Sequence, residues 1–139
     1  MRIGKWPAGY LSLMAILALA AGLASRYLVG RRCEMDGQAL SPTLRVDLKL
    51  ADGVTHSFCS IECARRWLAA QKQPVKEALV RDALNGDPLD AYVAVFVESP
   101  IVTNRANGNH IHAFRARTDA MDHIRRFGGH EIDDPFETP

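Results

Sequence analysis

Residues 43–71 contain two successive patterns of apolar and polar residues. Apolar residues alternate with polar ones over residues 43–50, and a second short run over residues 54–58 follows an Asp-Gly pair. Alternation on both sides of such a pair predicts a β-hairpin. Behind Ser60, a residue type that favours helix N-caps, the apolar spacing changes to three and four, which predicts a helix over residues 61–71.

The second half of the chain repeats this order. An apolar, β-branched run over residues 91–97 predicts a buried strand, and residues 110–114 predict a second strand behind an Asn-Gly pair. A helix is predicted to begin with Thr118 as its cap and to carry Ile124 and Phe127 on its buried face. A Gly-Gly pair ends this helix.

Together these patterns predict an α+β fold made of two related strand-strand-helix modules. The modules cover about residues 33–73 and 75–134, inside one domain over residues 31–139. Residues 75–84 fit either a strand or a helix, because their apolar positions suit a helix and their length also suits a strand. A body of about 110 residues buries a modest core without disulfide staples.

A run of about 20 uncharged residues, 6–25, precedes this domain. It follows Arg2 and Lys5, so residues 1–30 have the pattern of a signal segment or a membrane anchor. A signal core takes about 7–15 apolar residues and a spanning helix about 20, so we expect a retained N-terminal transmembrane helix. This predicts a single-pass protein of the bacterial inner membrane, with its soluble domain facing the periplasm or the outside.

The charged residues argue against several functions. Lys and Arg number 17 and Asp and Glu 16, for a net charge of +1. Nucleic-acid binding needs a clustered basic face, so we expect no nucleic-acid partner. The sequence also has no Gly-rich phosphate loop, no nucleophile elbow and no carboxylate pair spaced for acid–base chemistry. We therefore expect no enzyme activity.

The candidate chemistry lies in three cysteines and one methionine. Cys59 and Cys63 are four residues apart at the predicted start of a helix, so their sulfurs can converge. A helix N-terminus favours the thiolate, which predicts a lowered pKa for Cys63. Cys33 and Met35, from the segment before the hairpin, can bring a thiol and a thioether to the same point. These soft ligands match Cu(I), with Zn(II) as the alternative if His56 adds a nitrogen.

Other interpretations of the same residues stay open. Cys59 and Cys63 could form a disulfide or act as a thiol–disulfide oxidoreductase, or they could be inert buried side chains. A structural Zn(II) module that serves protein contacts is a further alternative. His110 and His112 alternate on a predicted strand and share a face, which suits either additional metal ligands or a solvent-facing edge.

Several segments together resemble the NosL family of nitrous oxide reductase accessory proteins, over about residues 33–134. These segments are Cys33-Glu34-Met35, Phe58-Cys59-Ser60-Ile61-Glu62-Cys63-Ala64, Ala113-Phe114, Ala120 and Phe127-Gly128-Gly129. The cysteine motifs are also similar to those of TRASH-type metal-binding modules. The resemblance implies a two-module α+β fold, a strand over residues 75–82, and Cys33 and Met35 as copper ligands.

From the residues and the resemblance together we expect a membrane-anchored, extracytoplasmic Cu(I)-binding metallochaperone. It would deliver copper to a copper-accepting client protein, for which the resemblance suggests nitrous oxide reductase. Chain position further suggests a division of work. Cys59 and Cys63 would hold the metal on a fixed helix start, and Cys33 with Met35 would form a mobile arm that delivers it.

Overall fold

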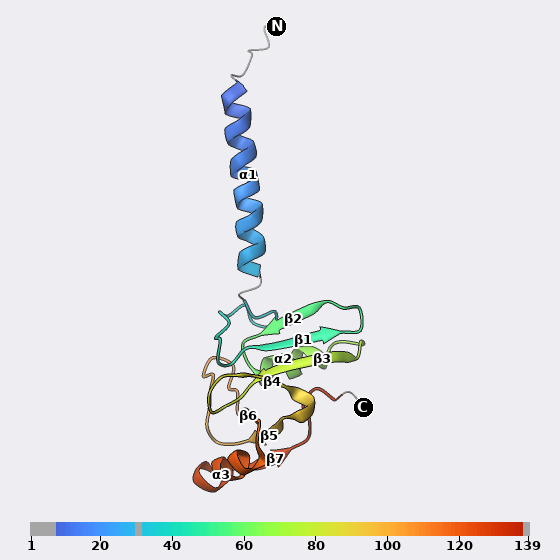
Figure 1. The fold of residues 1–139 in the computed structure, drawn as a ribbon, viewed down its shortest axis with the longest axis vertical. Helices are drawn as coiled ribbons and strands as arrows, with labels where there is room; N and C mark the ends of the chain where they lie inside the picture. Colours follow the sequence, from blue (N-terminus) through green and yellow to red (C-terminus); the bar gives the residue numbers. More distant parts are fainter. Residues whose placement is uncertain (1–7, 30–31, 138–139) are drawn as a thin grey trace. The chain divides into compact units, whose positions relative to one another are not determined.

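The computed structural model describes residues 8–29 and 32–137, and in the first helix it describes the side chains of residues 12–23. The chain divides into two compact units, residues 1–31 and 32–139. The first unit contributes one helix, α1. All the described strands and the other helices belong to the second unit, which we call the body (Figure 1).

Helix α1 (Ala8–Val29) covers most of the uncharged run and continues past its end. Of the helices in the described part of the chain, none combines the length and the apolar character that crossing a membrane requires. The predicted transmembrane helix, and with it the single-pass placement in an inner membrane, is therefore wrong.

The first sheet of the body is antiparallel, with the strand order β2-β1-β3-β4. The alternation over residues 43–58 forms the predicted hairpin, whose first strand buries every second side chain, and residues 75–81 form a strand as the resemblance implied. The four strands are β1 (Val46–Leu50), β2 (Thr55–Phe58), β3 (Val75–Arg81) and β4 (Pro88–Asp90).

Helix α2 (Ile61–Leu68) begins directly after β2. Ser60 is its N-cap, as predicted, because the Ser60 Oγ accepts a hydrogen bond from the Cys63 N–H at 3.2 Å. The helix ends at Leu68 rather than Gln71. The Gln71 N–H bonds to the Leu68 carbonyl three residues back, so the chain leaves the helix through a tighter turn.

The second sheet has the order β6-β5-β7, again antiparallel. Its strands are β5 (Val95–Glu98), β6 (Ile111–Phe114) and β7 (His130–Ile132), and helix α3 (Arg117–Phe127) contacts β5 and β6. Figure 1 shows these elements at one end of the body, beyond β4. The helix ends at Gly128, whose φ of 81° suits a residue without a Cβ.

Two details of the second half differ from the predictions. Residues 91–93 form a short 3-10 helix and not the start of a strand, because the Asp90 carboxylate accepts the Tyr92 N–H and caps a turn there. Helix α3 begins before Thr118, and its N-cap, Ala116, makes no side-chain hydrogen bond. Phe127 is 49% exposed, and Ala120 is the buried residue of this helix.

The two predicted modules share one main core. Strands β3 and β4 come from the second predicted module, yet they complete the sheet of the first. The main cluster of buried side chains joins Val46 and Phe58 of the first half with Phe96 and Phe136 of the second. A loop of the second half therefore has a fixed place beside helix α2, which positions the site.

Candidate metal centre

Three thiols and one carboxylate converge at the start of α2. One potential ligand atom from each of Cys33, Asp36, Cys59 and Cys63 lies within 4.8 Å of all the others. The three cysteine residues are each 2% exposed, and all three are free thiols. The predicted convergence of the cysteines is thus present in the fold, and the structure adds a carboxylate that the sequence argument left out.

Backbone hydrogen bonds hold the segment that carries Cys33 in a turn. The Cys33 N–H bonds to the Gln38 carbonyl at 2.7 Å, and the Cys33 carbonyl accepts the Gly37 N–H at 2.8 Å. The Glu34 N–H bonds to the Ser57 carbonyl of β2 at 3.0 Å. This tight turn corrects the expectation of a mobile arm, because its hydrogen bonds hold Cys33 against the same strand that leads into Cys59.

The capped helix start brings the other two sulfurs together. Cys59 precedes the cap residue Ser60, and Cys63 lies one turn into α2, which places their Sγ atoms 3.7 Å apart. The Cys63 N–H donates to the Ser60 hydroxyl, which fixes the first turn of the helix. One metal ion with Zn–S distances of about 2.3 Å would fit between two sulfurs at this separation.

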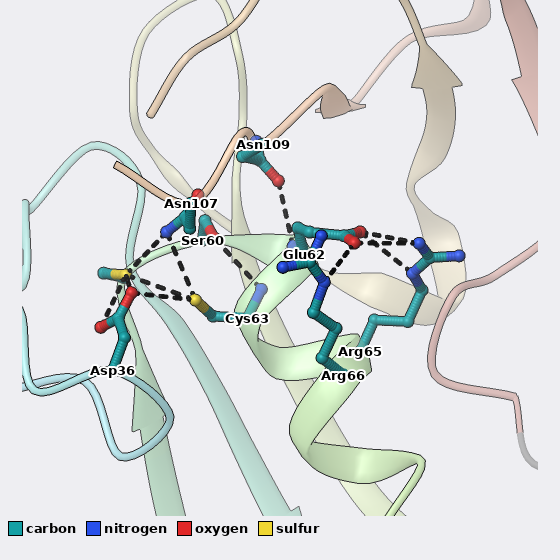
Figure 2. A network of polar contacts seen from close by, with 9 residues as sticks. Asp36, Ser60, Glu62, Cys63, Arg65, Arg66, Asn107 and Asn109 are labelled. Carbon is teal, nitrogen blue, oxygen red and sulfur yellow. Dashed lines mark hydrogen bonds and ion pairs between the residues drawn. The ribbon is translucent and has the colours of Figure 1, made fainter. Parts of the chain in front are cut away.

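Asp36 and Asn107 approach the two sulfurs from opposite sides (Figure 2). Asp36 Oδ2 lies 3.5 Å from Cys59 Sγ and 3.3 Å from Cys63 Sγ. Asn107 Nδ2 lies 3.2 Å and 3.3 Å from the same two atoms. The signal for Asp36 was its place three residues after Cys33, next to a glycine that permits a turn. Asn107 carried no comparable signal, since an Asn-Gly pair indicates only a turn.

Burial raises the pKa of both Cys59 and Cys63. Together with the Asp36 carboxylate it raises the pKa of Cys63 to about 12. At Cys59, burial and the neighbouring sulfurs of Cys33 and Cys63 also raise the pKa. The predicted lowering for Cys63 is therefore wrong, because burial and a carboxylate outweigh the helix N-terminus.

Hydrogen bonds have the opposite effect on Asp36. Partial burial alone would raise its pKa, but the Gln38 N–H and the three thiols donate to the carboxylate and lower the pKa to about 2. In the absence of metal, the cluster therefore combines the protonated thiols of Cys59 and Cys63 with a charged carboxylate that accepts their hydrogen bonds.

Met35 and His56 lie outside this cluster of four. Met35 is 46% exposed, in the same turn as Asp36. The His56 Nδ1 pairs with Glu34 Oε2 at 2.6 Å, and its ring lies 4.5 Å from that of Trp67. Both ligand assignments remain predictions. Glu34 already occupies one of the two ring nitrogens of His56.

His110 and His112 both contact Ser99 but differ in exposure. His112 is buried, and its Nε2 lies 3.0 Å from the Ile101 carbonyl and 3.2 Å from Ser99 Oγ. His110 is exposed, with its Nδ1 3.0 Å from the Ser99 carbonyl. Burial lowers the pKa of His112, as does its neighbour His123. Among the described residues, neither histidine belongs to the cluster at α2.

The start of α2 is also tied to the second half of the chain. Asn109 Oδ1 accepts the Glu62 N–H at 3.0 Å, which satisfies a backbone donor of the first helical turn (Figure 2). The buried Glu62 carboxylate pairs in turn with Arg65 and Arg66 at 2.8 Å and 2.7 Å. A side chain from the second half of the chain therefore holds the helix start that presents Cys63.

These features define a small α+β body with a thiol-rich candidate metal centre. The chain is similar to a solved structure described as the crystal structure of the copper chaperone NosL from Shewanella denitrificans. The TM-score is 0.66 at 22% sequence identity, and the match covers 79% of this chain and 91% of that one. No protein-family model matches the chain, and no curated protein does. The chain has the fold of NosL, so the resemblance predicted from its sequence is confirmed at the level of the fold.

Proposed function

We propose that this protein is a Cu(I)-binding metallochaperone that carries copper as cargo and passes it to an acceptor protein. The observation that carries the proposal is the convergence of three free thiols within one cluster, on a fold shared with a copper chaperone. Thiolates are the soft ligands that select Cu(I) over harder divalent cations. The sulfurs of Cys33, Cys59 and Cys63 would form the copper site.

The electrostatics of the cluster suit reversible loading. A thiol must lose its proton to bind metal, and raised thiol pKa values mean that protons compete with the cargo. Copper affinity should therefore rise with pH. Reactive redox cysteines need an accessible thiolate of lowered pKa, so the raised pKa values of Cys59 and Cys63 favour a carrier over a thiol–disulfide oxidoreductase.

The exposed side of the cluster offers a route for transfer. The cysteines are buried, whereas residues 34–37, which carry Met35 and Asp36, are exposed. An acceptor that approaches this turn could insert its own sulfur or nitrogen ligand while one cysteine leaves. Met35, with its exposed thioether, would be the first soft ligand that copper meets there. The resemblance names nitrous oxide reductase as the acceptor to test first.

Zn(II) is the second candidate cargo, and Asp36 is the observation that favours it. Three sulfurs and one carboxylate oxygen make the four ligands of a closed tetrahedral zinc site. In a copper site of three thiolates, the harder Asp36 oxygen would contribute little. The two metals therefore predict different roles for the same carboxylate.

An anaerobic competition experiment separates these functions. The full chain is titrated with Cu(I) against a chromophoric Cu(I) chelator, and separately with Zn(II) against a zinc indicator. We expect one Cu(I) per chain, lost in the Cys59→Ser, Cys63→Ser double variant and nearly unchanged in Asp36→Asn. Failure to retain Cu(I) against the chelator contradicts the proposal. Zn(II) binding that collapses in Asp36→Asn, with weak Cu(I) binding, identifies a zinc module instead.

A further inference from the structure

The Asn107 side chain contacts two cysteines of the candidate metal centre but is not itself one of the four potential ligands. It comes from the loop before β6, whereas Cys59 and Cys63 flank the start of α2. Its Nδ2 lies 3.2 Å from one sulfur and 3.3 Å from the other. A side-chain amide nitrogen has two hydrogens, so one can be donated to each sulfur. Of the described side chains, only Asn107 donates to both.

The orientation of this amide is set by the sulfurs. The Asn107 Oδ1 atom is buried and has no hydrogen-bond partner, so the oxygen does not hold the side chain in place. Buried polar atoms usually have partners, and an orphan at one end of an amide requires a compensating interaction at the other. The paired contacts to Cys59 and Cys63 are that interaction.

The loop around Asn107 is pre-organised. The Gly108 N–H bonds to the Asn104 carbonyl at 2.9 Å, and Asn109 is fixed to Thr103 at 2.6 Å and to Glu62 at 3.0 Å. These bonds close the loop on both sides of Asn107 and attach it to the helix that carries Cys63. The amide therefore needs no rearrangement to meet the sulfurs, which is the condition for an effective supporting contact.

The negative charge of the metal-loaded site explains why hydrogen bonds from Asn107 to the sulfurs matter. Three thiolates and a carboxylate carry four negative charges, and one Cu(I) ion offsets only one of them. Hydrogen bonds to charged acceptors are stronger than those between neutral groups. Asp36 approaches the sulfur pair from the other side and is itself negative, so it cannot disperse the charge (Figure 2).

We propose that Asn107 is a positioning residue of the metal centre, which donates to the Cys59 and Cys63 thiolates of the loaded site, raises affinity for the metal and slows its release. This rests on the proposed function, because it assigns a supporting residue to the same cluster. Asp36 contacts the sulfur pair from one side and Asn107 contacts it from the other (Figure 2). Residues that support metal ligands in this way are typically worth about 10–100-fold in metal affinity.

The test compares Asn107→Ala and Asn107→Asp with the wild type in the full chain, using Cu(I) alone as the probe. Asn107→Asp keeps the shape of the side chain but replaces the donor by a carboxylate. Affinity comes from chelator competition, release from the rate of transfer to the chelator, and ligation from the sulfur-to-copper charge-transfer absorption. Asn85→Ala, in the exposed β3–β4 turn, is the matched control.

We expect Asn107→Ala to weaken Cu(I) binding about 10–100-fold, with faster release and a shifted charge-transfer band. Asn107→Asp should weaken it further, and Asn85→Ala should leave it unchanged. Wild-type affinity, release and absorption in both Asn107 variants overturn the inference, while copper binding by the wild type leaves the proposed function standing. If the wild type itself does not retain Cu(I), the proposed function is what fails. If Asn107→Ala is unfolded, the isosteric Asn107→Asp decides between these outcomes.

Discussion

The Asp36 carboxylate lies 3.3 Å from the sulfur of Cys63, although 26 residues separate them in the sequence. The contact joins the turn before the first hairpin to the start of α2. It has two consequences for the cluster. The carboxylate gains hydrogen bonds that lower its pKa to about 2, and burial together with the hydrogen bond that Cys63 donates to Asp36 raises the pKa of Cys63 to about 12.

Removing this charge should make Cys63 more reactive. In Asp36→Asn the side chain keeps its shape, but the negative charge beside the thiol is gone, so the pKa of Cys63 falls and its thiolate fraction rises. We expect alkylation of the metal-free protein at pH 8 to be about two- to tenfold faster, with the site of modification identified by mass spectrometry. Asp122→Asn on the exposed face of α3 should have no such effect, and equal rates in all three proteins would contradict the assigned contact.

Cys33 should matter more than Met35 for Cu(I) affinity. A thiolate is a charged ligand within the cluster, whereas the Met35 thioether is neutral and 46% exposed. We expect Cys33→Ser to weaken Cu(I) binding by about 100-fold or more and Met35→Leu by less than about tenfold, in the chelator competition. Met121→Leu is a matched control, because Met121 is 47% exposed on α3. An unchanged affinity in Cys33→Ser would exclude that thiol from the site.

The metal-free protein should lose stability at alkaline pH. The folded-state pKa of Cys63 is about 12, above its ordinary value of 9.0, so the fold favours the protonated thiol. That contribution is present below pH 9 and is lost as the pH rises from 9 towards 12, by up to about 1.4 kcal/mol per pH unit for each such thiol. Urea unfolding at pH 8 and pH 10.5 measures the loss. Cys63→Ser should show a smaller loss, and a stability that increases over this range would reverse the assigned shift.

Asn109 should be important for stability. Its buried amide accepts the Glu62 N–H and donates to Thr103 Oγ1 and the Ile111 carbonyl, so truncation leaves several buried polar groups without partners. We expect Asn109→Ala to lower the free energy of unfolding by about 2–3 kcal/mol. Asn85→Ala, at an exposed turn, should cost less than about 1 kcal/mol. Calorimetry compares the two, and similar melting temperatures would contradict this role for Asn109.

Gly129 should tolerate no side chain. Its φ is +109°, and a Cβ there would lie 2.3 Å from the Glu98 carbonyl oxygen, a backbone atom of the paired strand β5. Gly53 has a φ of +84° with open space around it, so it isolates the conformational cost alone. We expect Gly53→Ala to cost about 1–2 kcal/mol and Gly129→Ala to cost at least about 3 kcal/mol or to prevent folding. Equal costs in denaturant unfolding would show that the close approach is relieved without strain.

The sequence by itself determined the hairpin over residues 46–58, the Ser60 cap and the convergence of Cys59 with Cys63. All three follow from local geometry, since strand alternation, capping and the spacing of one helical turn are properties of a few neighbouring residues. Hydrophobic periodicity predicted secondary structure less well in segments whose conformation is decided by tertiary contacts. Residues 75–81 became a strand because they pair with β1, and residues 91–93 became a 3-10 helix around the Asp90 cap.

Only the tertiary structure decided which other side chains reach the sulfurs and in what electrostatic state. Asp36 and Asn107 lie in turns without periodicity, and packing of the two halves around one core brings them to opposite sides of Cys59 and Cys63. The helix N-terminus predicted a reactive thiolate. Burial and the Asp36 carboxylate reverse that expectation, because a pKa depends on the charges and solvent around a group and not on its place in the chain.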